Sequence, residues 1–197
     1  MKGELSMKRI MILFAYMWIA SSFLLAMTEA TPTEREVTTF HNQIVTLRVS
    51  RVVDGDTFEG YIDNGGNPGV NPLAIELNRL TIRICGIDAP ERGQYYGDVA
   101  TRHLNYRIGG ETVQLELIRK DRYGRWVAKV SINGLDVAGE MLKHGLAWYY
   151  KEYENIPSYA QLEAGARLRR LGLWRDDRAV PPWEWRKMGK VERDLYR

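Results

Sequence analysis

Apolar and polar residues alternate along several short segments of this chain, as they do in β-strands with one buried face. The first segment, residues 44–53, places its valines and its leucine mainly on one side. The Asp54-Gly55 pair that follows is a strong hairpin signal, and residues 57–62 are the expected return strand. Residues 64–72, rich in Gly, Asn and Pro, predict a loop, and residues 74–85 predict a third strand.

Further along the chain, the apolar spacing switches between the helical and the strand period. The expected strands are 112–118 and 126–132, and the expected helices are 98–108, 135–144 and 158–171. Ser158 and Gln161 would form a capping box for the last helix, whereas residues 180–185, with adjacent prolines, are expected to be irregular. About five strands and three helices predict an α+β fold that is mainly β, a five-stranded barrel of the OB type.

The start of the chain predicts an export signal. Basic residues are followed by residues 10–27 without a charge, and Thr28 and Ala30 supply the small residues of a cleavage site. The alternative is an uncleaved membrane anchor, for which the apolar run is just long enough. In both cases we expect the domain outside the cytoplasm, either secreted or periplasmic. The expected division is a signal peptide at 1–30, a flexible segment at 31–42, a folded domain at 43–175 and a tail rich in Pro and Trp at 176–197.

Composition indicates a globular chain with an uneven charge. Its 197 residues, 45% of them hydrophobic, suffice for one core, and the single cysteine, Cys85, excludes an internal disulfide. Residues 31–118 carry 8 basic and 12 acidic side chains, a net charge of −4, while residues 119–197 carry 17 and 11, a net charge of +6. An acidic part for a cation beside a basic part for a polyanion suits nucleic acid, although ordinary scatter of surface charge would give the same balance.

Three segments carry residues that could do chemistry. They are Asp54-Gly55-Asp56-Thr57, then Arg83 with Asp88-Ala89-Pro90-Glu91, and Asp121-Arg122-Tyr123-Gly124-Arg125. The carboxylates of Asp56, Asp88 and Glu91 are hard ligands that suit Ca²⁺, and by ligand type Mg²⁺ or Mn²⁺. The guanidinium forks of Arg83 and Arg125 match two phosphate oxygens. Arg83 alternates with apolar neighbours, so it is expected on a surface or in a groove. The pattern predicts a metal-dependent phosphodiesterase; the alternatives are a simple turn and surface ion pairs.

The three segments resemble the signatures of the staphylococcal nuclease family over about residues 45–174. Arg83 lies five residues before Asp88, Glu91 lies three after it, and Arg125 closes a Tyr-Gly-Arg sequence. The resemblance implies a Ca²⁺-dependent nuclease on an OB-fold that acts on DNA and RNA. It also implies cleavage of the bond to the 5′ oxygen, which leaves a 3′ phosphate.

The same resemblance implies a role for each site residue. The ligands of Ca²⁺ would be Asp56, Asp88 and the main-chain carbonyl of Ala89. Glu91 would orient or deprotonate the attacking water, while Arg83 and Arg125 would bind the phosphate and stabilise the transition state. The residues implied in substrate binding are Arg122, Tyr123, Tyr150 and Tyr153.

A second hypothesis comes from another class, a noncatalytic OB-fold module that binds nucleic acid. The intact set of acids and arginines favours the enzyme over this alternative. In either case we expect DNA and RNA as partners, no stable protein partner and a monomer. The aromatic residues at 148–150 are expected mainly in the core, with base stacking as the other possibility. His41, His103 and His144 are expected at the surface rather than on a metal.

Overall fold

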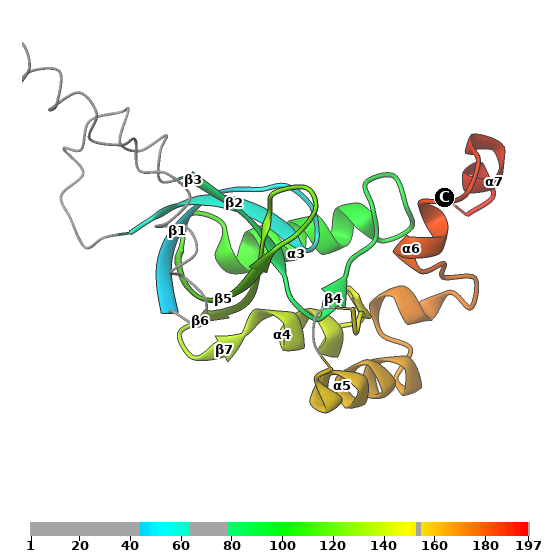
Figure 1. Cartoon of the computed structure of the whole chain (residues 1–197). Helices are drawn as coiled ribbons and strands as arrows, with labels where there is room; N and C mark the ends of the chain where they lie inside the picture. Colours follow the sequence, from blue (N-terminus) through cyan, green and yellow to red (C-terminus); the bar gives the residue numbers. More distant parts are fainter. Residues whose placement is uncertain (1–43, 64–78, 153–154, 197) are drawn as a thin grey trace, which may run out of the picture. The chain divides into compact units, whose positions relative to one another are not determined.

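Five β-strands close into a barrel in the computed structural model of this chain, which describes residues 44–63, 79–152 and 155–196 (Figure 1). The barrel strands are β1 Ile44–Val52, β2 Thr57–Ile62, β3 Arg79–Ile84, β5 Thr112–Lys120 and β6 Trp126–Ile132. They pair antiparallel in the order β3-β2-β1-β5-β6, and a parallel pairing between β3 and β6 closes the ring. This mixed barrel is the α+β architecture predicted from the sequence, and it is consistent with an OB-fold.

The inward faces of the strands form the barrel core. Leu47, Phe58, Ile82 and Leu115 are fully buried, and each comes from a different strand. Burial of each such side chain stabilises the fold by about 1.5–3 kcal/mol. The strands expected at 44–53, 57–62, 112–118 and 126–132 are confirmed, with bounds that differ by at most two residues. The loop expected at 64–72 and the start of the strand expected at 74–85 lie outside the described residues.

Short strands position the segment that follows the barrel strand β3. The two-residue strand β4, Ile87–Asp88, pairs antiparallel with β8, Trp148–Tyr149, so that Asp88 lies opposite Trp148. A further short strand, β7 at Leu135–Asp136, pairs with the end of β6. Asp88 is therefore fixed by a ladder outside the barrel, directly after Arg83 and its strand.

Within the described ranges, three helices of seven or more residues accompany the barrel (Figure 1), namely α3 Gly97–Ile108, α4 Val137–Lys143 and α5 Pro157–Leu168. The helix α3 ends before Gly109, as expected. The helix α4 begins later than expected because Leu135–Asp136 is a strand and the Asp136 carboxylate caps the helix, accepting the Ala138 N–H at 3.1 Å. The capping box at Ser158 is wrong, because Pro157 already occupies the first helical position.

The tail contains regular structure, contrary to the prediction for 180–185. After a short 3-10 helix at Gly172–Arg175 come two short helices, α6 Pro182–Trp185 and α7 Lys190–Asp194. Proline is tolerated at the start of α6 because the first turn of a helix needs no N–H donor. No helix in the described part of the chain is both long and apolar enough to cross a bilayer, and the signal expected at 1–30 lies outside that part.

Side-chain contacts anchor the tail to the body of the domain. Trp185 is buried, and the Gln94 side-chain amide donates to the Val180 carbonyl at 2.6 Å. The ring of Trp183 stacks on that of Tyr150, with 5.5 Å between the ring centres. The tail is therefore held against the loop after Asp88 and the chain after β8.

Gly55 lies where the hairpin turn packs closely against the rest of the domain. A Cβ at this position would lie 2.6 Å from the Ala89 Cβ and 2.8 Å from the Ala100 Cβ in α3. Because those groups must then move, Gly55→Ala is expected to lower the free energy of unfolding by about 1–3 kcal/mol, measured by urea denaturation. Gly165→Ala in α5 is the control, because a Cβ there meets only the distant end of Arg169. This variant should keep or raise the free energy of unfolding. Equal values for the two variants would contradict the packing described here.

Candidate active site

A cavity of about 700 Å³ collects residues from distant parts of the chain. It is lined by every predicted site residue within the described ranges, namely Asp56, Arg83, Asp88, Ala89, Glu91, Arg122, Tyr123, Arg125 and Tyr150. Tyr153 lies outside those ranges. The barrel explains the meeting, since β3 pairs with both β2 and β6, and the segments that carry the acids and Arg125 adjoin these three strands.

Arg83 lies between two carboxylates at the end of β3. Its Nη1 forms an ion pair with Asp56, and its Nη2 donates to Asp88 Oδ1 at 2.8 Å. The side chain is only 7% exposed, so Arg83 lies in a groove, as one reading of the sequence expects, but not on an open surface. Burial acts to lower the Arg83 pKa, yet the charges of Asp56 and Asp88 outweigh it and hold the pKa above its ordinary value. Arg83 therefore stays charged although it is buried.

The hairpin turn fixes Asp56 through several hydrogen bonds. The Asp56 carboxylate accepts the Ala89 N–H at 2.7 Å and the Thr57 hydroxyl at 2.9 Å, while its carbonyl oxygen accepts the Ile84 N–H at 2.8 Å. The Asp56 N–H in turn donates to Asp54 Oδ1 at 3.0 Å. Burial, together with the charge of Asp56, raises the pKa of Asp54 to about 7. The turn thus brings the Asp54 carboxyl group close to that of Asp56, which disfavours ionisation of Asp54.

Asp121 aims Arg125 into the cavity. Asp121 Oδ1 accepts the N–H groups of Tyr123 at 2.9 Å and Arg125 at 3.0 Å, and Oδ2 contacts Arg125 Nε and Nη2, each at 2.8 Å. Gly124 has a φ of 80°, which the tight turn requires. Burial works against it, but the bonds from Arg125 hold the Asp121 pKa below its ordinary value. Arg125 Nη1 thereby comes 3.5 Å from the hydroxyl of Thr57 in β2.

Cationic and aromatic side chains border the cavity on the same side as Arg125. The exposed lining residues of this segment are Arg119, Lys120, Arg122 and Tyr123. The guanidinium of Arg122 lies 4.9 Å from the centre of the Tyr123 ring, and that of Arg125 lies 5.4 Å from it. Tyr150 also lines the cavity, whereas its neighbours Trp148 and Tyr149 are buried, as expected for core residues. This border presents positive charge and flat rings together.

Arg186 is a cavity residue that the sequence analysis missed. It follows α6, and its Nη2 donates to Asp88 Oδ2 at 2.8 Å while its Nη1 donates to Glu91 Oε1 at 2.7 Å and to Asp88 Oδ1 at 3.3 Å. Burial acts to lower the Arg186 pKa, but its bonds to Asp88 and Glu91 outweigh it and raise the pKa above its ordinary value. Because 98 positions separate Arg186 from Asp88, no local sequence pattern links the two.

Around Arg83, the carboxyl groups outnumber the arginines that contact them. The acids of the hairpin turn and of the segment after β3 are Asp54, Asp56, Asp88 and Glu91, and the arginines bonded to members of this set are Arg83 and Arg186. Burial raises the Asp88 pKa, although Arg186 and Arg83 act in the opposite direction. A converging excess of carboxylate oxygen suits a hard divalent cation. The residues therefore fit the Ca²⁺ expected from the sequence. Arg83 contacts the carboxylates of both Asp56 and Asp88, and the Ala89 N–H also donates to Asp56.

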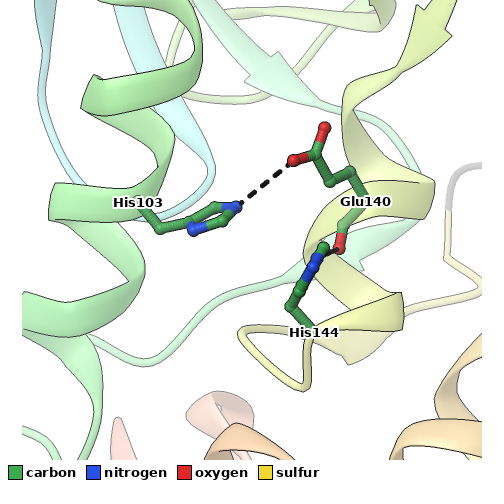
Figure 2. Close-up of side chains that lie close together, drawn as sticks. All are labelled: His103, Glu140 and His144. Atoms are coloured by element: carbon green, nitrogen blue, oxygen red, sulfur yellow. Dashed lines mark hydrogen bonds and ion pairs between the residues drawn. The ribbon is translucent and has the colours of Figure 1, made fainter.

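A second group of possible ligands lies between α3 and α4 (Figure 2). His103 Nε2 is 3.5 Å from Glu140 Oε1, and His144 Nδ1 donates to the Glu140 carbonyl oxygen at 2.8 Å. Arg107 Nε contacts both carboxylate oxygens of Glu140, at 2.8 and 3.0 Å. The single carboxylate is thus balanced by an arginine, and we assign this group to the packing of the two helices. His144 is exposed as expected, but His103 is half-buried and has partners that the sequence did not reveal.

Comparison with known proteins gives a consistent set of relatives. Residues 81–176 match the family described as staphylococcal nuclease homologue. An uncharacterized endonuclease of Escherichia coli O157:H7 is 36% identical over 140 residues, 71% of this chain and 83% of that protein. An uncharacterized endonuclease of Haemophilus influenzae is 32% identical over 146 residues, 74% of this chain and 75% of that protein. The staphylococcal-like nuclease CAN1 of Arabidopsis thaliana is 40% identical over 113 residues, 57% of this chain but 35% of the plant protein.

The half-buried His103 gives the fold a predictable response to acid. Burial, assisted by His144, lowers the His103 pKa below its ordinary value of 6.5. Below pH 6.5 the unfolded chain therefore takes up a proton before the folded chain does, so the free energy of unfolding falls as the pH drops from 6.5 toward the lowered pKa. We expect His103→Gln to remove this part of the acid loss, measured by urea denaturation at pH 7.5 and 5.5. The same loss in the variant and the parent would contradict the assignment.

Proposed function

Because the chain belongs to the staphylococcal nuclease family, we propose that it is a Ca²⁺-dependent nuclease that hydrolyses phosphodiester bonds in both DNA and RNA. The observation that carries this proposal is the meeting, in one cavity, of the carboxylates of Asp56, Asp88 and Glu91 with the guanidinium groups of Arg83 and Arg125. Names of relatives that contain "endonuclease" or "nuclease" support the same class of reaction. The proposed products carry 3′ phosphates, as in the family.

The arginines supply the recognition of the reacting phosphate. Arg125 is partly exposed and already aimed by Asp121, so its free donors are available to a phosphate oxygen. Arg83 is charged, buried and fixed between acids, which makes it a preorganised donor toward the negative charge that grows in the transition state. Because both groups face the same cavity, a single diester can contact them together.

Glu91 is the proposed residue that orients or deprotonates the attacking water. Its side chain is 37% exposed in the cavity, and its backbone N–H is held by the Gln94 side chain at 3.0 Å. A carboxylate in this place can receive the proton as water attacks phosphorus opposite the leaving 5′ oxygen. Asp56 and Asp88, with the main-chain carbonyl of Ala89, are the proposed ligands of Ca²⁺. The cation, when bound, supplies positive charge next to the phosphate oxygens.

The exposed border of the cavity would hold the rest of the strand. Arg119, Lys120 and Arg122 offer charge to neighbouring phosphates, and the rings of Tyr123 and Tyr150 offer faces for nucleotides. Contacts of this kind carry little base specificity, which agrees with action on both DNA and RNA.

We also propose that the domain acts outside the cytoplasm, after export directed by residues 1–30. The basic start and uncharged run of that segment support export. The N-terminal sequence of the protein recovered from the cell envelope or medium decides between a cleaved signal and a retained anchor. Recovery only from the cytoplasm would contradict export in either form.

The proposed roles of Glu91 and Arg125 are tested by substitution. We expect Glu91→Gln to lower the rate of DNA cleavage about 10²–10⁴-fold, because the proton acceptor is lost, and Arg125→Ala to lower it about 10³-fold or more. Arg178→Ala, on the exposed tail and paired with Asp176, is the matched control and should keep the parental rate. Arg83→Ala is less informative, because it leaves two buried carboxylates without their partner and costs about 3–5 kcal/mol of stability.

The same assay tests the cation requirement and the noncatalytic alternative. A Ca²⁺ chelator should abolish cleavage, and added Ca²⁺ should restore it. Parental cleavage in chelator would contradict the proposed cofactor. Binding of DNA without cleavage under all conditions, with folded protein, would overturn the enzyme and leave a binding module.

A further inference from the structure

Arg186 joins the tail to two of the acids assigned to the reaction, although it lies outside the matched family region of residues 81–176. Asp88 Oδ1 accepts from Arg83 Nη2 at 2.8 Å and from Arg186 Nη1 at 3.3 Å, and Asp88 Oδ2 accepts from Arg186 Nη2 at 2.8 Å. Each oxygen of Asp88 is thus bonded to a guanidinium group. A cation that binds Asp88 must therefore displace or share one of these bonds.

The two arginines on Asp88 differ in how easily they can be displaced. The Arg83 side chain is 7% exposed and is also paired with the buried Asp56. The Arg186 side chain is 45% exposed, and its second partner, Glu91, is 37% exposed. Bonds at a partly exposed site exchange with water at lower cost than bonds in a buried one. Arg186 is therefore the group that a cation would replace on Asp88.

The tail can release this side chain without detaching. Trp185, the neighbouring residue, is buried, and the backbone carbonyl of Arg186 accepts from Arg193 Nη2 at 3.1 Å. Arg193 Nε also donates to the Trp185 carbonyl at 3.1 Å. These contacts hold the backbone while the guanidinium stays at the accessible end of the side chain. Competition on Asp88 then involves the rotation of one side chain rather than unfolding of the tail.

We propose that Arg186 is an internal competitor of the divalent cation and sets the cation concentration at which the Asp56–Asp88 site fills. This inference rests on the proposed function, since it assumes that the site binds Ca²⁺. Arg186 neutralises part of the charge of Asp88 and Glu91 in the free enzyme and yields Asp88 when the ion arrives. The tail thereby tunes the site through charge, without contributing a ligand to the ion.

Calorimetric titration of Ca²⁺ into the full chain, without nucleic acid, tests this competition. Arg186→Gln removes the charge but keeps a polar side chain, and Asp88 keeps Arg83, so the variant should remain folded. We expect it to bind Ca²⁺ about 10-fold more tightly or better, because the ion no longer displaces a charge-assisted hydrogen bond. Arg178→Gln removes an arginine of the same tail that pairs only locally with Asp176, and it should keep the parental affinity.

The variant Asp88→Asn shows which part of the heat of Ca²⁺ binding comes from the Asp56–Asp88 site. It therefore distinguishes failure of the proposed competition from failure of the proposed cofactor. Equal or weaker Ca²⁺ affinity in Arg186→Gln, with binding that Asp88→Asn abolishes, would overturn the competition and leave the proposed function intact. The absence of any Ca²⁺ binding that depends on Asp88, in parent and variant alike, would overturn the proposed cofactor and the competition with it. As an independent reading, the Ca²⁺ concentration for half-maximal DNA cleavage should fall in Arg186→Gln by the same factor.

Discussion

The site depends on the ion pairs that the charged Arg83 forms with the buried carboxylates of Asp56 and Asp88. Groups of this kind are costly to bury, and they persist only where geometry and hydrogen bonds offset the loss of water. The barrel provides that geometry, because β3 pairs with β2 on one side and β6 on the other, and the ladder of β4 with β8 fixes Asp88. The fold thus holds a charged triad where an open surface would let its members separate.

Around this triad, acidic and basic side chains come from different segments of the chain. Asp54, Asp56 and Asp88 lie at the hairpin turn and in β4, while exposed cations at the end of β5 and in the β5–β6 connection line the cavity. Such an order draws a polyanion to the border and a small cation to the interior. The tail adds a positive charge next to the acids, since Arg186 contacts both Asp88 and Glu91. We therefore expect the site to respond to cation concentration as well as to substrate.

Sequence periodicity was sufficient for the barrel strands and for α3, because alternation and helical spacing reflect burial directly. The spacing of Arg83, Asp88 and Glu91 was sufficient to select residues that line one cavity. Sequence patterns were not sufficient for the helices of the tail or for contacts between distant segments. Adjacent prolines favour irregular structure at 180–185, yet the first turn of a helix accepts proline, and α6 begins there. The contacts of Arg186 with Asp88 and of His103 with Glu140 join segments that only the folded chain brings together. No local sequence pattern could therefore reveal them.

The proposed mechanism requires that one cavity hold a cation and a diester together. A crystal structure of the chain with Ca²⁺ and a nonhydrolysable dinucleotide tests it most directly. We predict the ion on Asp56 and Asp88, the phosphate in contact with Arg83 and Arg125, and the Arg186 side chain turned away from Asp88. An ion bound elsewhere, or a phosphate that contacts neither Arg83 nor Arg125, would contradict it.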